Sequence, residues 1–121
     1  MGSALEAVNR FYGTTNNRDA DGVARHVGDD IKFVGPLMAT TGAEAYVEIN
    51  RQLLPNHLAT RMKVQFENGD EVCSIYEMDL RTPDGGSLTV EMADWITVTD
   101  GKIRSQRIYY DPRKFAEAFD M

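Results

Sequence analysis

The amino-acid sequence predicts an α+β fold, in which N-terminal helices pack against a curved antiparallel sheet around an internal pocket. Apolar residues recur at helical spacing in the first half of the chain, whereas after residue 60 they alternate with polar residues, as in strands. Because the helices precede the sheet instead of alternating with its strands, a parallel α/β arrangement is disfavoured. With 121 residues, we expect one domain, residues 1–121.

Three helices are predicted before the sheet. The first covers residues 3–16, where Leu5, Val8, Phe11 and Tyr12 recur at helical spacing. Asp19 is placed to cap a short second helix that includes Val23 and Val27 and ends at Asp29-Asp30. The sequence Thr41-Gly42-Ala43-Glu44 has capping-box spacing and starts a third helix that runs to about Leu54.

Five strands and a terminal helix complete the predicted order. A short strand, residues 31–34, lies between the second and third helices, and four longer strands follow as a meander, at residues 62–66, 72–80, 88–99 and 103–110. Asp100-Gly101 is a strong hairpin signal between the last two. Asp111 precedes Pro112 and is expected to cap a final short helix that contains Phe115, Ala118 and Phe119.

The charge balance excludes several classes of partner. The formal net charge is -6 and the isoelectric point is near 4.8, so nothing would attract a phosphate backbone and no nucleic-acid partner is expected. The first twenty residues contain no continuous apolar run of the signal-peptide type, and no membrane-spanning run follows. We therefore expect a cytoplasmic protein without a membrane partner.

No metal or other cofactor is expected. His26, His57 and Cys73 are too far apart in sequence to form a recognisable ligand spacing. Cys73 lies in an apolar run and is interpreted as a small buried hydrophobic residue. His57 follows Pro55-Asn56 in an expected loop at the pocket edge, where it is the candidate for a base near neutral pH.

Two segments resemble a known family. The sequences ADGVARHVGDDIKFVGP and ADWITVTDGKIRSQRIYYDPRKFAEAF, in this element order, are similar to the SnoaL-like and ketosteroid-isomerase-like branch of the nuclear-transport-factor-2-like (NTF2-like) superfamily. The resemblance spans nearly the whole chain and implies the cone-shaped NTF2-like, or cystatin-like, fold. Members of that superfamily include isomerases, polyketide cyclases, epoxide hydrolases, dehydratases and proteins that only bind or assemble, so the resemblance alone does not name a reaction.

Asp94 is the leading catalytic candidate. It interrupts an alternating apolar face made of Leu88, Val90, Met92, Ile96 and Val98. A carboxyl group in such a position must find partners or stay protonated, because burying an unpaired carboxylate is costly. The resemblance places Asp94 at the oxyanion-stabilising aspartate of ketosteroid isomerases, which implies a role as an acid or hydrogen-bond donor. The alternative is a purely structural pairing with an Arg or with backbone groups.

The rest of the ketosteroid isomerase apparatus is missing. The proton-shuttling carboxylate of that family falls just before Pro36, where this chain has Gly35, and its phenolic donor falls at Phe11. Tyr12 is adjacent and points about 100° further around the helix. Steroid isomerisation by that mechanism is therefore disfavoured, although Tyr12 remains a ligand-binding candidate.

Limonene-epoxide hydrolases provide a second comparison. Asp79 matches the strand aspartate of that family, but Glu77 stands at its arginine position and Ile108 at its last-strand aspartate. Epoxide hydrolysis by that triad is disfavoured. Asp79 is kept as a ligand-binding candidate.

The face to which Glu77 and Asp79 point is left open by the sequence. A two-residue turn at Asp84-Gly85 would place both acids on the face of Asp94. One more loop residue would instead turn Tyr76, Met78 and Leu80 to the pocket. In that second arrangement the acids point outward and Glu77 or Glu91 pairs with Arg107, which avoids repulsion among clustered carboxylates.

The last strand supplies further candidates. Gln106, Ile108 and Tyr110 share one face, which the resemblance implies is the pocket face. Tyr110 could donate its hydroxyl to a ligand carbonyl, with Gln106 orienting the ligand. Met38 and Met92 are further expected to line the pocket. The opposite face carries Trp95 and Tyr109, which predict a homodimer through the outer surface of the sheet.

Two functional hypotheses result. One is a cofactor-independent isomerase or cyclase that acts by acid/base chemistry on a small apolar carbonyl compound, with Asp94 and Tyr110 as catalytic residues. The other is a non-catalytic binding or dimeric assembly module, in which methionine and aromatic side chains fill the cone.

Overall fold

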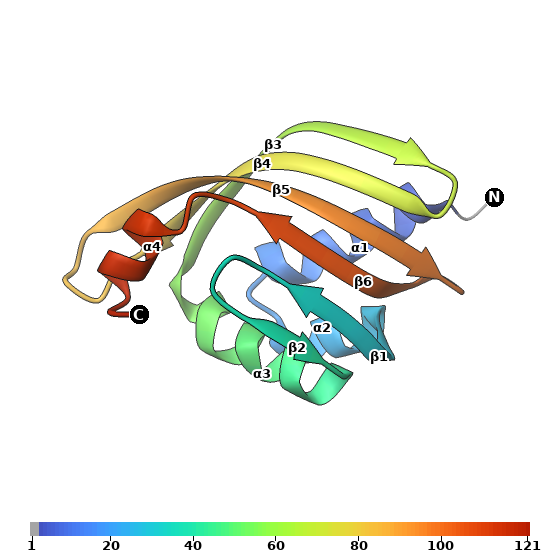
Figure 1. The fold of residues 1–121 in the computed structure, drawn as a ribbon, viewed down its shortest axis with the longest axis horizontal. Helices are drawn as coiled ribbons and strands as arrows, with labels where there is room; N and C mark the ends of the chain where they lie inside the picture. The colour runs from blue at the N-terminus through green and yellow to red at the C-terminus, as the bar shows by residue number, and fades with distance from the viewer. Residues whose placement is uncertain (1–2) are drawn as a thin grey trace.

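The computed structural model of the chain describes residues 3–121 and shows helices packed against one face of a curved six-stranded sheet (Figure 1). The helices are α1 (Ala4–Asn16), α2 (Ala20–His26), α3 (Ala43–Leu53), a 3-10 turn η1 (Leu54–Asn56) and α4 (Arg113–Ala118). The strands are β1 (Val27–Val34), β2 (Ala39–Thr41), β3 (His57–Asn68), β4 (Glu71–Arg81), β5 (Ser87–Thr99) and β6 (Lys102–Tyr109). This arrangement confirms the predicted α+β fold.

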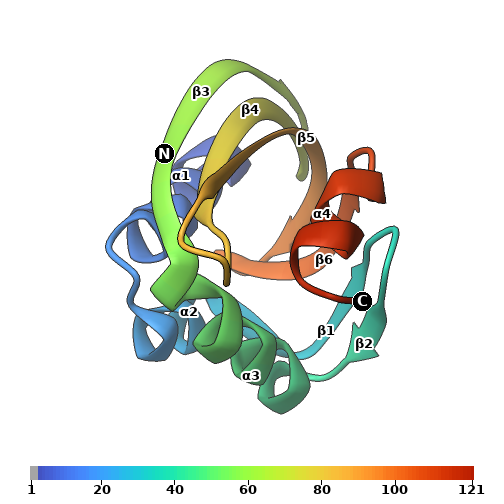
Figure 2. The ribbon, with the colours of Figure 1, turned by 90° about the vertical axis from the view of Figure 1, so that its left-hand side faces the viewer.

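The sheet has the order β2-β1-β6-β5-β4-β3. The three pairs of the predicted meander, β3–β4, β4–β5 and β5–β6, are antiparallel, as predicted. Strand β2 was not predicted and pairs antiparallel with β1, whereas β1 and β6 pair in parallel. The parallel pair arises because β1 belongs to the N-terminal half of the chain and returns to the sheet beside its last strand. Figure 2 shows that α3, α4 and the β4–β5 connection surround one end of the curved sheet.

Side-chain caps begin α1 and α2, but not α3 or α4. Ser3 accepts a hydrogen bond from the backbone of Glu6 at the start of α1, and Asp19 accepts one from Gly22 at the start of α2, as predicted. The predicted capping box at α3 is wrong, because Gly42 is the cap and no side chain bonds to the helix start. At α4 the cap is Pro112 instead of Asp111, although Asp111 accepts a hydrogen bond from the Arg113 backbone amide.

Two strands begin earlier than the sequence indicated. The second helix ends at His26, so Val27, Asp29 and Asp30 belong to β1 and not to a helix. Strand β3 starts at His57. Its pairing with β4 is irregular near that end, so the residues there do not alternate regularly between the two faces and no strand signal was visible in the sequence. The Asp100-Gly101 hairpin is present, with both residues at positive φ.

The core lies between α1, α3 and the inner face of the sheet. On β5 the buried positions alternate along Val90, Met92, Asp94, Ile96 and Val98, as predicted. The buried apolar side chains from the helices and β1 include Val8, Phe11, Tyr12, Val23, Ile31, Tyr46 and Val47. Asp94 is therefore the one carboxyl in this buried stripe of β5.

The connection between β4 and β5 is longer than either of the two turns predicted from the sequence. Tyr76 pairs with Met92 and Glu77 with Glu91, because residues Thr82 to Gly86 form a longer connection than either predicted turn. This register places Tyr76 and Leu80 on the buried face and Glu77 and Asp79 on the outer face. The outward arrangement holds, but the acids pair with Arg61 and Lys63 instead of Arg107.

Candidate active site

Two adjacent cavities lie inside the cone. An outer cavity of about 310 Å³ and an inner cavity of about 90 Å³ share the lining residues Phe33, Ile49, Leu53, Met78 and Ile108. The outer cavity is lined by residues of α3 and α4, which places it at the end of the cone seen in Figure 2. The inner cavity reaches the buried polar residues of β5 and β6. Together they can hold a molecule with an apolar body and one polar end.

Asp94 lines the inner cavity and is completely buried. Its Oδ2 atom accepts hydrogen bonds of 2.9 Å from the hydroxyls of Tyr12 and Tyr76. Its Oδ1 atom has no hydrogen-bond partner among residues 3–121. Asp94 is thus a buried carboxyl with one oxygen held by two hydroxyl groups and the other without a hydrogen-bond partner.

The burial of Asp94 raises its pKa from 3.8 to about 6, because desolvation disfavours the charged form. Hydrogen bonds from Tyr12 and Tyr76, together with the Gln106 side chain, act in the opposite direction and limit the rise in pKa. The carboxyl is therefore poised to take up or release a proton near neutral pH.

Gln106 is held beside this carboxyl by a third tyrosine. The hydroxyl of Tyr46, on α3, donates a 2.5 Å hydrogen bond to Oε1 of Gln106 on β6. The amide oxygen of Gln106 accepts from Tyr46, and the N–H groups of the same amide are the donors with which Gln106 acts on Asp94. Burial and the nearby Asp94 raise the pKa of Tyr12, Tyr46 and Tyr76, so all three keep their hydroxyl protons at physiological pH.

A chain of aromatic rings lines the inner cavity. The ring centroids of Tyr76 and Tyr12 lie 5.7 Å apart, those of Tyr12 and Phe11 5.5 Å, those of Phe11 and Tyr46 6.4 Å, and those of Tyr46 and Phe33 5.6 Å. These tilted contacts fix the rings that carry the hydroxyl groups. The polar groups around Asp94 are therefore preorganised by packing.

The predicted site residues divide into three groups. Asp94, Tyr12, Gln106 and Ile108 line the inner cavity, and Met38, Met92, Ile108 and Tyr110 line the outer one. Tyr110 is half-buried, and burial raises the pKa of its phenol. His57 and Asp79 line neither cavity.

His57 lies at the start of β3, where it is buried and lines neither cavity, although its partner Thr60 lines the inner one. Its Nε2 atom lies 2.7 Å from the hydroxyl of Thr60, and the guanidinium of Arg18 donates to its backbone carbonyl. Burial and the nearby Arg18 lower the pKa of the imidazole. The expected loop at the pocket edge is instead a strand, so a ligand contact by His57 has no geometric support.

Asp79 lies on the outer face of β4, in a bidentate pair with Arg61 and within 2.6 Å of the hydroxyl of Thr89. The hydrogen bonds from Arg61 and Thr89 lower its pKa to about 2. A ligand-binding role for Asp79 inside the cone is therefore wrong, because the strand parity turns it outward.

Tyr46 and Tyr76 were not among the predicted site residues. Tyr76 would have been found had the β4–β5 register been known, since it shares the parity of Leu80. Tyr46 lies on the buried face of α3, but a tyrosine at a core-facing helical position carries no signal that separates a site residue from a packing residue.

The described residues hold no group of three His, Cys, Asp or Glu side chains arranged for a metal ion. Nor does any helix in this part of the chain have the length and apolar character needed to cross a bilayer.

The sequence profile of the SnoaL-like domain matches residues 8–106. The chain belongs to the SnoaL-like domain family. This SnoaL-like domain finds no match among curated protein sequences. Its fold is that of the NTF2-like superfamily, as the sequence predicted.

Solved structures share the fold at low sequence identity. An NTF2-like protein from Cytophaga hutchinsonii is 21% identical, with a TM-score of 0.80 over 95% of this chain and 96% of its own. TerC, crystallised with polyporic acid, is 20% identical, with a TM-score of 0.82 over 98% of both chains. An epoxide hydrolase from M. tuberculosis, similar to limonene-epoxide hydrolase, is 19% identical, with a TM-score of 0.80 over 96% of this chain and 88% of its own.

Proposed function

We propose that this SnoaL-like domain binds a small, uncharged, largely apolar carbonyl compound and catalyses a proton transfer on it, as a cofactor-independent isomerase or cyclase. The observation that carries the proposal is the state of Asp94, a fully buried carboxyl on an apolar cavity with one oxygen anchored and the other free. Among residues 3–121, no Lys, Arg or His lines either cavity. An anionic ligand would therefore find no positive charge there.

In this proposal Asp94 acts first as a base. Both tyrosine hydroxyls donate to the carboxyl, which favours a proton acceptor over the hydrogen-bond donor expected from the ketosteroid isomerase resemblance. The carboxylate removes a proton from the carbon next to the ligand carbonyl, and the C–H electron pair forms the enolate. The amide N–H of Gln106 donates to the enolate oxygen. The protonated Asp94 then returns the proton to another atom, or the enolate carbon attacks a second carbonyl before the proton returns.

Tyr110 has a supporting role in this scheme. It lines the outer cavity, where its hydroxyl can orient a second polar group of the ligand or its ring can pack against the ligand body. Hydrolysis of an epoxide by paired aspartates is not proposed, because Asp79 lies outside the cavities and Asp94 is the lone carboxyl that lines them among the described residues.

Deuterium exchange tests the chemistry without knowledge of the natural substrate. β-Tetralone, a neutral ketone with acidic protons next to its carbonyl, would be incubated with the protein in D2O and followed by proton NMR. We expect the wild type to accelerate exchange and Asp94→Asn to lose at least about a hundredfold, within the range of general-base contributions. Asp79→Asn is the matched control, since it removes a carboxylate outside the cavities. Equal exchange by wild type and Asp94→Asn would contradict the catalytic proposal.

A non-catalytic binding module is the second candidate. It is favoured by Gly35, which lines the outer cavity at the position where the related isomerases carry a carboxylate. In that case β-tetralone binds with equal affinity to wild type and to Asp94→Asn, and exchange is not accelerated.

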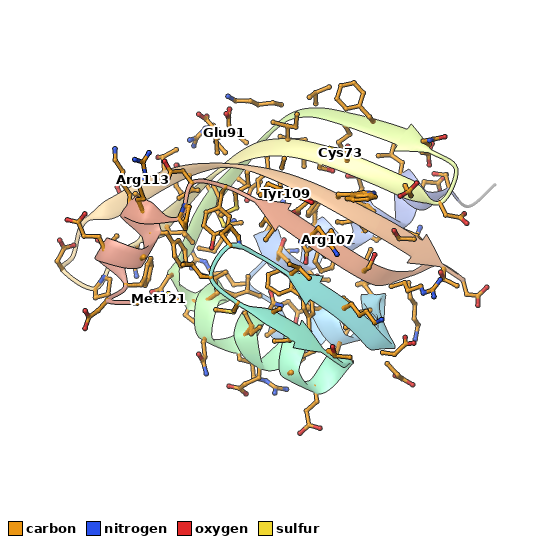
Figure 3. The ribbon with its side chains drawn as sticks, viewed as in Figure 1. Cys73, Glu91, Arg107, Tyr109, Arg113 and Met121 are labelled. Carbon is orange, nitrogen blue, oxygen red and sulfur yellow. The ribbon has the colours of Figure 1, made fainter. Side chains whose placement is uncertain are left out.

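We also propose that the outer sheet face binds a second copy of the chain. Two neighbouring rows of cross-strand partners form a belt across four strands that is apolar except for Arg107 at its β6 edge. One row is Val64, Ile75, Ala93 and Tyr109, and the other is Phe66, Cys73, Trp95 and Arg107. Figure 3 labels Cys73 on β4 and Arg107 and Tyr109 on β6 in this belt. Phe66 is 59%, Tyr109 53% and Trp95 44% exposed, an unusual concentration of aromatic surface for a monomer.

A belt of this kind is suited to a two-fold symmetric contact, because the same patch on each copy can cover the other. Cys73 is half-buried within the belt and is not the core residue expected from the sequence.

A further inference from the structure

The C-terminal segment builds one wall of the outer cavity. Tyr110, Phe115, Phe119 and Met121 all line it, and they follow the last residue of the SnoaL-like match, Gln106. In contrast, Asp94, Tyr12, Tyr76, Tyr46 and Gln106 lie within the matched range. The matched range therefore includes the inner polar cluster and ends before this wall.

Three aromatic rings of the segment pack in series. The ring centroids of Tyr110 and Phe115 lie 5.7 Å apart, and those of Phe115 and Phe119 lie 4.8 Å apart with an interplanar angle of 30°. Phe115 is buried and anchors the short helix α4, whereas Phe119 is half-buried. Figure 1 shows that α4 lies at one end of the sheet, apart from α1 and α2. Phe119 thus presents part of its ring to the cavity while Phe115 holds it in place.

The wall has no charged side chain that lines the cavity. Arg113, Lys114 and Glu117 of α4 are exposed and are not lining residues. Met38 and Leu37, from the β1–β2 hairpin, also contribute to the same cavity. A flat apolar ring between aromatic and thioether side chains satisfies this environment without an unmatched polar group.

We propose that Phe119, supported by Phe115 and Tyr110, is the specificity-determining residue that selects a ligand with a second, fused ring. This inference rests on the proposed function, because it places the ligand carbonyl at Asp94 in the inner cavity and the second ring in the outer one. Because Asp94 lines the inner cavity and Phe119 the outer one, we expect a two-ring ketone to contact both residues and a one-ring ketone held at Asp94 not to contact Phe119.

Cyclohexanone and β-tetralone test this selection, since β-tetralone is a cyclohexanone ring fused to a benzene ring. Dissociation constants would be measured by ligand-observed NMR for the wild type, Phe119→Ala and the control Lys114→Ala, an exposed substitution in the same helix. We expect Phe119→Ala to weaken β-tetralone binding by about tenfold and cyclohexanone binding by less than about twofold. Lys114→Ala should leave both constants unchanged.

Three results would overturn the inference. The first is an equal loss of affinity for both ketones in Phe119→Ala, which indicates a structural effect of Phe119. The second is unchanged binding of β-tetralone by Phe119→Ala. The third is a wild-type protein that does not bind the two-ring ketone more tightly than the one-ring ketone. The proposed function is decided separately, by the dependence of deuterium exchange on Asp94 with either ketone. Phe119→Leu keeps an apolar side chain and is expected to retain the fold if Phe119→Ala does not, with an intermediate loss for β-tetralone alone.

Discussion

The hydroxyl of Tyr12, on α1, donates a 2.9 Å hydrogen bond to Oδ2 of Asp94, on β5, although the two residues are 82 positions apart in sequence. This bond links the N-terminal helix to the centre of the sheet at the closed end of the cavity. A hydrogen bond to a charged acceptor stabilises the charged form. Tyr12 therefore sets both the position of the carboxyl and its readiness to lose a proton.

The first prediction concerns the tyrosine donors. Tyr12→Phe removes one of the two hydrogen bonds that favour ionised Asp94, so the pKa of Asp94 is expected to rise further above its present value of about 6. Tyr76→Phe should act in the same direction. Titration of the carboxyl carbon of Asp94 by NMR measures this directly. An unchanged or lowered midpoint in both variants would show that the tyrosines do not bond to the carboxylate.

The second prediction is a pH dependence of stability. The pKa of Asp94 is raised from 3.8 to about 6 in the folded state, so its stabilising contribution is present below pH 3.8 and is lost as pH rises through about 6. The loss amounts to about 3 kcal/mol between those limits. Asp94→Asn has no such titration. Urea unfolding of wild type and variant should show the wild type losing about 2 to 3 kcal/mol relative to Asp94→Asn between pH 4 and pH 8. If the free energies of unfolding of wild type and Asp94→Asn changed in parallel with pH, the predicted contribution of Asp94 would be refuted.

The third prediction tests the link between Tyr46 and Gln106. Tyr46→Phe leaves the buried amide oxygen of Gln106 without its donor, which is expected to cost about 1 to 3 kcal/mol in the free energy of unfolding. In a double-mutant cycle with Gln106→Leu, the combined loss should be smaller than the two separate losses added together. Strict additivity would indicate that the two side chains do not interact.

The fourth prediction concerns the apolar belt. Trp95→Lys and Tyr109→Lys place charges at the centre of the proposed two-fold contact, and each should convert a dimer to a monomer by light scattering at micromolar concentration. Glu117→Lys, an exposed charge change on α4 outside the belt, is the control. A monomeric wild type, or dimers that persist in both belt variants, would contradict the dimer proposal.

Local sequence patterns predicted the α+β class and the burial of Asp94, and the family resemblance added the cone-shaped fold. Alternation along β5 identified Asp94 as a carboxyl on the core face, because the period of a strand determines which side chains share a face. Alternation along β6 placed Gln106 and Ile108 on one face, and the family resemblance implied that this face lines the pocket. The Asp100-Gly101 turn fixed the relation of these two strands, since its backbone requires residues that tolerate positive φ.

The remaining site residues depend on long-range geometry that a local pattern does not carry. Tyr76 and Asp79 lie on opposite faces of β4, and their assignment depended on the length of the loop from Thr82 to Gly86. Tyr46 meets Gln106 because α3 packs across the sheet, a contact between residues 60 positions apart. His57 was assigned to a loop, but the irregular start of β3 buries it in the sheet.

The most direct test of the account is the NMR titration of the Asp94 carboxyl in the wild-type protein, assigned by its absence in Asp94→Asn and repeated with bound β-tetralone. The account predicts a midpoint near pH 6 in the free protein and a shifted midpoint when the ketone is bound, because the ligand occupies the space beside the carboxyl. A midpoint at or below 3.8, unaffected by the ketone, would show that Asp94 is a structural carboxylate that does not exchange a proton with a ligand.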